Sequence, residues 1–216
     1  MSSKEARTFY DRFGAKQDKQ AFYEDKALSA LEGASLFADA RHVFEFGFGT
    51  GRFARRLFEK YLSDEATYTG VDVSSTMYRL ASERLQRWQE SVTLTLTEGE
   101  TEFDLPANDF DRFVSAYVLD LLNPEALCAV LAEAHRLLAP DGLLCLVSLT
   151  NPVELSGYLT AIIWRLLFHV NPSIVGGCRP IALKQFLAES DWRIIHHKTV
   201  VSWTITSEIV VATPLK

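Results

Sequence analysis

Strand-like and helix-like segments alternate along residues 42–150, and this order constrains the fold more than any other feature of the chain. Apolar or alternating runs predict strands at 42–47, 66–73, 91–99, 110–119 and 142–150. Apolar residues at helical spacing predict helices at 51–62, 74–89 and 123–138, with an earlier helix at 19–37. Strands that alternate with helices of this length form βαβ units, so we expect a mainly parallel sheet with helices on both faces.

The last part of the chain breaks this alternation. A short helix is expected near 181–190, and strands at 192–203 and 206–214 follow with no helix between them, so these two strands must pair antiparallel. The expected fold is therefore a three-layer α/β sandwich, whose seven-stranded, mainly parallel sheet ends in an antiparallel pair. At 216 residues we expect a single domain, 1–216, in which 1–40 form an N-terminal helical cap and 151–180 an apolar insertion.

Charge is distributed unevenly and argues against a nucleic-acid partner. The formal net charge is -6, and residues 61–150 hold 5 basic and 15 acidic residues, a balance of -10. A groove that binds phosphate needs clustered Lys and Arg, so an acidic centre of this kind is unsuited to nucleic acid. The two flanks, each at about +2 by the same charge count, leave room for an anionic small molecule or headgroup.

Cysteine usage and the first residues predict a cytoplasmic protein without metal or disulfide. The three cysteines have no CxxC spacing, so we expect buried free thiols. The opening MSSKEARTFYDRF lacks the apolar run of a signal peptide. Residues 153–170 would span about 27 Å as a helix, but Glu154, Arg165 and His169 make a membrane span improbable. Contact of this segment with a membrane surface stays open.

The segment VFEFGFGTG (43–51) ends the first strand with a glycine loop that leads into a helix. At the carboxyl end of a strand, such a loop lies where open α/β sheets bind ligands, although a plain glycine turn is the alternative. Dinucleotide binding needs GxGxxG, but here Arg52 occupies the place of the third glycine. Glu45, two residues before the first glycine, would repel a pyrophosphate and accept a hydrogen bond from an ammonium group.

Acidic residues end the next two strands. Asp72 can accept from both hydroxyls of a ribose, or can serve only as a carboxylate at a helix N-terminus. EGETEFDLP (98–106) can receive an adenine amino group, or can be a solvated acidic loop. Taken together, the three strand ends predict a pocket for a nucleoside with a cationic, phosphate-free tail, and S-adenosyl-L-methionine has this character.

These segments resemble the class I S-adenosylmethionine-dependent methyltransferases, in particular the branch with the ubiquinone and menaquinone biosynthesis enzymes and their small-molecule and lipid relatives. VFEFGFGTG and TGVDVSSTM are similar to the first two motifs of the family, EGETEFDLP to its GDAExLP segment, FDRFVSAYVLDLL to its fourth-strand motif and LLAPDGLL to the turn before its fifth strand. The resemblance covers about residues 10–142. It implies cofactor-binding roles for nine residues: Glu45, Gly47, Gly49, Gly51, Asp72, Met77, Glu100, Thr101 and Ser115.

The resemblance implies in-line methyl transfer, but the acceptor stays open. Tyr10, Tyr117 and Asp120 are the candidates near the methyl group, and Asp120 stands where relatives often have a histidine. The apolar insertion, with Trp164, suggests a lid over a small, hydrophobic or lipid-like acceptor, with Arg179 for an anionic group. Burial of this helix against the sheet or in a dimer contact is the alternative.

Two functions of other classes remain, a nicotinamide-dependent oxidoreductase and a non-catalytic adenosylmethionine-binding protein. The atom that is methylated and the oligomeric state are not fixed by the sequence.

Overall fold

The computed structural model describes residues 3–152 and 178–216. The whole of the predicted helix at 153–170, including Trp164, therefore lies outside the described residues. Seven strands form one sheet in the order β3-β2-β1-β4-β5-β7-β6. They are β1 (His42–Phe46), β2 (Thr67–Asp72), β3 (Val92–Leu96), β4 (Phe110–Ala116), β5 (Leu138–Leu149), β6 (Trp192–Ser202) and β7 (Ile205–Pro214).

The pairing of the strands confirms the predicted fold class. Strands β1 to β5 pair in parallel, whereas β7 lies antiparallel between β5 and β6. The α-helices are α1 (Ser3–Phe13), α2 (Ala21–Ala34), α3 (Arg52–Lys60), α4 (Ser75–Leu85) and α5 (Pro124–Leu137). Short 3-10 segments are η1 (Gly14–Gln20), η2 (Phe37–Asp39), η3 (Gln86–Trp88), η4 (Leu119–Leu121) and η6 (Leu183–Phe186).

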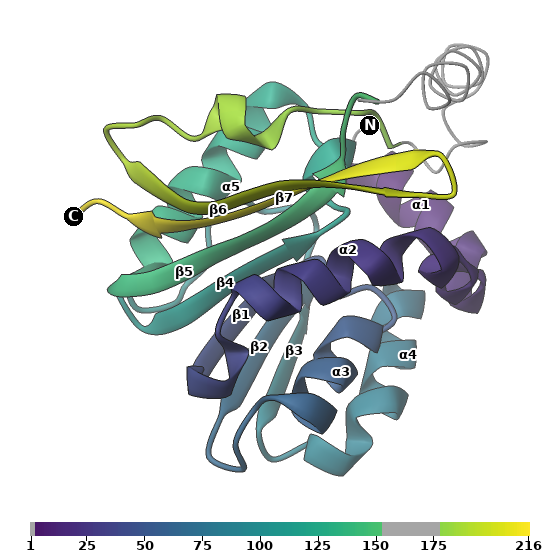
Figure 1. Ribbon diagram of the computed structural model, residues 1–216. Helices are drawn as coiled ribbons and strands as arrows, with labels where there is room; N and C mark the ends of the chain where they lie inside the picture. The colour runs from purple at the N-terminus through teal and green to yellow at the C-terminus, as the bar shows by residue number, and fades with distance from the viewer. Residues whose placement is uncertain (1–2, 153–177) are drawn as a thin grey trace.

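Two hydrophobic clusters cover the two faces of the sheet. Helices α2, α3 and α4 pack with one face, and α5 with η6 packs against the other, as Figure 1 shows. Successive residues of a strand enter opposite clusters: Val43 belongs to the first and Phe44 to the second. This alternation explains why the inner strands read as continuous apolar runs, because both of their faces are buried.

Strand β5 begins at Leu138, four residues earlier than predicted. Phe110 pairs with Leu138, but Arg112 pairs with Leu143, so the register shifts between these two points. Pro140 lies in this irregular stretch and has no N–H to donate to a ladder. The sequence analysis therefore predicted the end of α5 correctly to within one residue. It interpreted the bulged start of β5 as a turn.

The prediction of buried thiols is wrong for one of the three cysteines. Cys145 and Cys178 are buried, whereas Cys128 is exposed. In α5 the buried positions include Leu127, Val130 and Leu131, and Cys128 lies between them in sequence but outside this buried face of the helix. Among the described residues, no helix is long and apolar enough to cross a membrane.

Gly51 packs α3 closely against α4. Its φ is +72°, and a Cβ built there would lie 3.0 Å from both the Cα and the Cβ of Ala81. Gly33, near the end of α2, has no heavy atom within 4 Å of the same built position. The two glycines thus form a matched pair for substitution. Gly51 is required by its backbone conformation and by close packing, whereas the space around Gly33 can accept a side chain.

We expect Gly51→Ala to lower the free energy of unfolding by about 1–3 kcal/mol, because alanine is strained at positive φ and would press on α4. Gly33→Ala is expected to leave it unchanged or to raise it by up to about 1 kcal/mol. Urea unfolding followed by circular dichroism measures both. Wild-type stability of the Gly51→Ala protein would contradict this account of α3 packing.

Candidate active site

A large cavity opens at the carboxyl ends of β1, β2, β3 and β4. It holds about 840 Å³ of empty space, including the part open to solvent. Its wall combines strand ends, the glycine loop and the N-terminal segment. The lining residues that carry the argument are Tyr10, Gln17, Gly47, Gly49, Asp72, Met77, Glu100, Thr101, Tyr117, Leu121 and Leu122.

The Asp72 carboxylate holds the glycine loop in place. Its Oδ2 accepts from the Gly49 N–H at 2.9 Å, and its Oδ1 accepts from the Ser74 N–H, also at 2.9 Å. Burial raises the pKa of Asp72 to about 6, although these backbone hydrogen bonds act to lower it. The end of β2 therefore fixes the backbone of the loop after β1, and its carboxylate lines the cavity.

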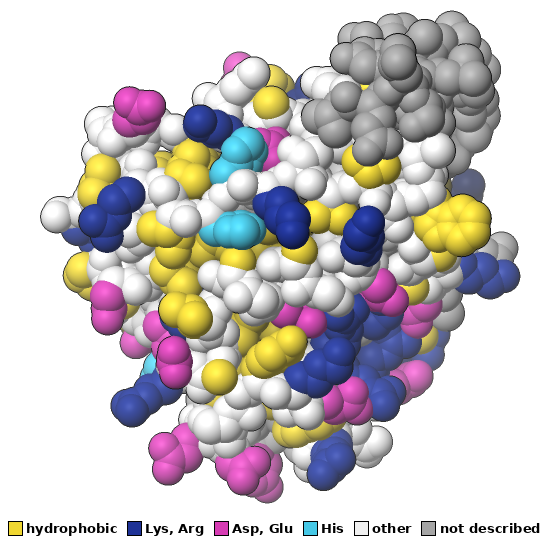
Figure 2. All heavy atoms as spheres, viewed as in Figure 1, with side chains coloured by type: hydrophobic (Ala, Val, Ile, Leu, Met, Phe, Trp, Pro, Cys, Tyr) yellow, Lys and Arg dark blue, Asp and Glu magenta, His cyan; other side chains and the backbone are white. Residues whose placement is uncertain are grey.

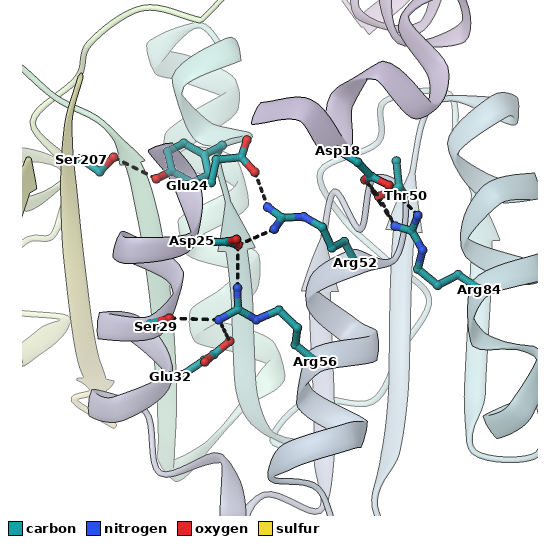
Figure 3. A network of polar contacts seen from close by, with 11 residues as sticks. Asp18, Glu24, Asp25, Ser29, Glu32, Thr50, Arg52, Arg56, Arg84 and Ser207 are labelled. Carbon is teal, nitrogen blue, oxygen red and sulfur yellow. Dashed lines mark hydrogen bonds and ion pairs between the residues drawn. The ribbon is translucent and has the colours of Figure 1, made fainter. Parts of the chain in front are cut away.

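The N-terminal segment covers the cavity and is attached at two places. Asp11 accepts hydrogen bonds from the Ser74 hydroxyl at 2.7 Å and the Thr76 N–H at 3.1 Å, at the start of α4. This position suits a carboxylate, because the first turn of a helix has free N–H groups. Asp18 accepts from Arg84 Nη2 at 2.6 Å and from the hydroxyl of Thr50, as Figure 3 shows.

A second, smaller cavity also borders the glycine loop. It holds about 430 Å³ of empty space and shares Gln17, Gly47, Gly49 and Tyr117 with the first. Glu45 is buried here and accepts a short hydrogen bond from the Tyr68 hydroxyl. Burial raises the pKa of Glu45 to about 8.

Ion pairs beside this second cavity join α2 to α3. Arg52 Nη2 lies 2.6 Å from Glu24 Oε2, and its other terminal nitrogen contacts Asp25. Arg56 contacts Asp25 at 2.7 Å and Glu32 at 2.8 Å (Figure 3). Figure 2 shows these helices as a region of neighbouring positive and negative side chains, so the arginines here are occupied by carboxylates.

Tyr117 and Asp120 follow the end of β4. Tyr117 has φ +57°, and its hydroxyl shares a hydrogen bond of 2.9 Å with Ser207. Asp120 is fully buried in η4, and its Oδ2 accepts from the Leu149 N–H at 3.1 Å. Its Oδ1 has no hydrogen-bond partner among the described residues, and burial raises the pKa of this carboxyl to about 7.

The structure places most of the predicted site residues together. Tyr10, Gly47, Gly49, Asp72, Met77, Glu100, Thr101 and Tyr117 line the large cavity, and Glu45 lines the smaller one.

Four other predicted residues lie elsewhere on or behind the wall. Gly51 packs against Ala81 of α4. The buried Ser115 hydroxyl donates to the Phe46 carbonyl at 3.2 Å. Arg179 donates to the Leu122 carbonyl at 2.6 Å, and its backbone N–H donates to the Asp120 carbonyl. Asp120 adjoins Leu121, which lines the large cavity. Trp164 lies outside the described residues.

Sequence reasoning missed Gln17, which lines both cavities. It lies in η1, a segment without apolar periodicity, and a single glutamine in a polar stretch gives no signal. The only pointer was its closeness in sequence to Tyr10, which the resemblance had placed over the cofactor.

Residues 43–142 match the model of a family of methyltransferase domains. This segment of the chain is similar to a methyltransferase domain. This match includes the glycine loop, Asp72, Glu100 and Tyr117, so it covers the residues that bring the cavity together. The predicted resemblance to the methyltransferases is confirmed, because residues 43–142 match a family of methyltransferase domains.

Three similar proteins show how far this methyltransferase relationship extends. Malonyl-[acyl-carrier protein] O-methyltransferase of Geobacter sulfurreducens is 31% identical over 148 residues, covering 66% of this chain and 52% of that protein. Demethylmenaquinone methyltransferase of Tropheryma whipplei is 31% identical over 110 residues, 51% of this chain and 42% of the relative. The solved structure of N-methyltransferase NodS of Bradyrhizobium japonicum has a TM-score of 0.66 and 19% identity, covering 89% of this chain and 88% of NodS. The chain thus matches about half the length of these curated relatives.

Buried carboxyl groups of the site make the stability of the protein depend on pH. The pKa values of Asp72, Asp120 and Glu45 are raised to about 6, 7 and 8, so the folded chain binds these protons more tightly than the unfolded chain does. The free energy of unfolding should therefore fall as the pH rises from about 5.5 to 8.

Urea unfolding of the ligand-free protein across this range measures the slope. Glu45→Gln, which imitates the protonated side chain, should flatten the part of the curve near pH 8. A free energy of unfolding that stays level or rises with pH would show that these carboxyl groups are not held protonated by burial.

Proposed function

We propose that this protein transfers the methyl group of S-adenosyl-L-methionine to a small, hydrophobic acceptor. The observation that carries the proposal is the meeting of four strand ends in one cavity, where the glycine loop and Asp72 stand side by side. The carboxyl ends of parallel strands are where α/β sheets bind their ligands.

The residues of the cavity fit this cofactor. Among the described lining residues, the charged side chains are Asp72 and Glu100, and both are acidic. A pyrophosphate would be repelled there, whereas a nucleoside with a sulfonium and an ammonium group suits the cavity. Asp72 is proposed to hold the ribose hydroxyls, Met77 to pack against adenine, and Glu100 with Thr101 to bound the adenine edge. Glu45, across the loop, is proposed to face the ammonium group.

The protein's part in the reaction is alignment and exclusion of water. When bound, S-adenosylmethionine supplies a methyl group on a sulfonium, which an electron-rich acceptor atom attacks in line while a neutral thioether leaves. Tyr10 and Tyr117 are proposed to flank the acceptor and to hold it on the line of attack. The N-terminal segment, fixed through Asp11 and Asp18, closes one side of the cavity against solvent.

The acceptor is proposed to be hydrophobic because its side of the cavity is apolar. Val118, Leu121, Leu122 and Ala126 line it. Two of the relatives are named for methylating demethylmenaquinone and malonyl-[acyl-carrier protein], and the first of these acceptors has the same apolar character. Four further points stay predictions from the sequence. They are the binding of an anionic acceptor group by Arg179, a lid that includes Trp164, contact with a membrane surface and a cytoplasmic location.

Asp120 is proposed as the proton acceptor for an acceptor that arrives protonated. Its Oδ1 lacks a partner among the described residues. Asp120 also lies in sequence between two residues that line the cavity, Val118 and Leu121. A carboxyl with a pKa near 7 is matched to accept a proton at neutral pH.

A non-catalytic adenosylmethionine-binding protein is the second candidate, since the same residues would serve binding alone. Production of S-adenosylhomocysteine with any acceptor would reject it. The nicotinamide-dependent oxidoreductase has no support from the domain family, which is that of methyltransferases.

We expect wild-type protein to bind S-adenosylhomocysteine in calorimetric titration and Asp72→Ala to bind it more than about 30-fold more weakly, because hydrogen bonds to a charged group contribute about 1.5–3 kcal/mol. Glu102→Ala, which removes an exposed carboxylate from the same loop region as Glu100, serves as the control and should bind normally. Failure of the folded wild-type protein to bind would reject the proposed function.

With an acceptor that must lose a proton, methyl transfer should rise as the pH passes about 7, where Asp120 ionises. Asp120→Asn should slow transfer by about 10²-fold or more and abolish that rise, while the dissociation constant of S-adenosylhomocysteine stays within about twofold. Rates of adenosylhomocysteine formation from pH 5.5 to 8.5 measure this. An unchanged profile in the variant would remove Asp120 from proton transfer.

A further inference from the structure

The amide of Gln17 lies where the two cavities meet. It lines both of them, together with Gly47, Gly49 and Tyr117. A Cβ built on Gly49 would lie 3.3 Å from both Gln17 Nε2 and Gln17 Oε1, so the amide rests directly on the backbone of the glycine loop. No other side chain of the N-terminal segment that the structure describes comes into both cavities.

Gln17 Oε1 is a buried acceptor that needs a donor. It has no hydrogen-bond partner among the described residues, and the surrounding chain leaves it no access to solvent. An acceptor left in this state destabilises the fold, since it has given up water without replacing it. A ligand with a hydrogen-bond donor at this point would remove that cost.

The surroundings favour a positively charged donor. The smaller cavity is lined by three carboxyl groups, those of Asp18, Glu24 and Glu45, and by one guanidinium, that of Arg52. Arg52 already contacts Glu24 and Asp25, as Figure 3 shows. Glu45 has no ion-pair partner among the described residues, and burial raises its pKa to about 8, so an ammonium group at this position would favour its charged form and gain an ion pair.

We propose that Gln17 accepts a hydrogen bond from the α-ammonium group of the cofactor's methionine tail, opposite Glu45, and that this bond draws the N-terminal segment onto the bound cofactor. The inference rests on the proposed function, because it assigns one end of the same cofactor. The inference goes beyond the proposed function because it gives the segment before α2 a part in recognising the methionine tail. The resemblance placed only Tyr10 of this segment near the cofactor.

The N-terminal segment is attached to the rest of the domain on both sides of Gln17, so a bond between Gln17 and the cofactor can act on the whole segment. Asp18, the next residue, contacts Arg84 and Thr50, and Asp11 contacts the start of α4 (Figure 3 shows the first of these). Asp18 and Thr50 line the smaller cavity, but both contacts are made within the chain, so they hold the segment in place without a ligand. The bond to Gln17 adds a contact inside the cavity that exists only when a tail with an ammonium group is present.

Calorimetric titration with two ligands tests the inference. S-adenosylhomocysteine carries the amino-acid tail, and 5′-methylthioadenosine has the same nucleoside without it. Gln17→Ala should weaken the binding of S-adenosylhomocysteine by about tenfold, the effect of one hydrogen bond to a charged group, and should leave 5′-methylthioadenosine within about twofold of wild type. Gln17→Glu, which keeps an acceptor and adds a negative charge, should bind S-adenosylhomocysteine at least as tightly as wild type.

Lys19→Ala is the matched control, because Lys19 is exposed on the same segment. It should bind both ligands as wild type does. Wild-type affinity of Gln17→Ala for S-adenosylhomocysteine would overturn the inference while leaving the proposed function intact. Equal weakening of both ligands would also overturn it, since Gln17 would then act on the nucleoside or on the fold. Absence of binding to wild type would overturn the proposed function and this inference together.

Discussion

The carboxylate of Asp72 is the contact on which the rest of the site depends. It accepts from Gly49 on one side and from Ser74 on the other, so it joins the loop after β1 to the start of α4. Ser74 in turn caps α4 through the Met77 N–H and donates to Asp11. A single run of hydrogen bonds therefore extends from the centre of the sheet to the segment that covers the cavity. The resemblance assigns this same carboxylate to the ribose, so in the proposed function one residue both binds the cofactor and fixes the position of the loop.

The site combines an apolar cavity with buried acidic groups that have no basic partner in contact within the part of the chain that the structure describes. Asp120 and Glu45 are both buried, and the pKa of each is raised by burial. Groups of this kind destabilise the ligand-free protein at neutral pH, because the charged form is poorly solvated. A ligand with positive charge relieves that cost, so a site that is strained when empty is also selective for a cation. The arginines nearby do not compete, since those on α3 are already paired with carboxylates of α2.

The sequence alone predicted the sheet well, because the physical cause of each strand is local. Val43 and Phe44 show why: buried on opposite faces, they give an unbroken apolar run that reads as an inner strand. The same apolar runs, each followed by a loop, predicted that Gly49 and Asp72 lie at the ends of neighbouring strands. It failed at Leu138, where a strand starts directly after a helix through a bulge, since neither periodicity nor turn residues mark such a start. It also missed Gln17, because a contact between a 3-10 segment and a distant loop is decided by tertiary packing and leaves no pattern in the sequence.

The most direct test of the central claim is a crystal structure of the protein with S-adenosylhomocysteine. The account predicts the ribose hydroxyls on Asp72, adenine beside Met77 and Thr101, and the amino-acid tail turned across the glycine loop toward Glu45. A complex with the nucleoside outside the cavity at the ends of β1 to β4, or with the ribose away from Asp72, would contradict it.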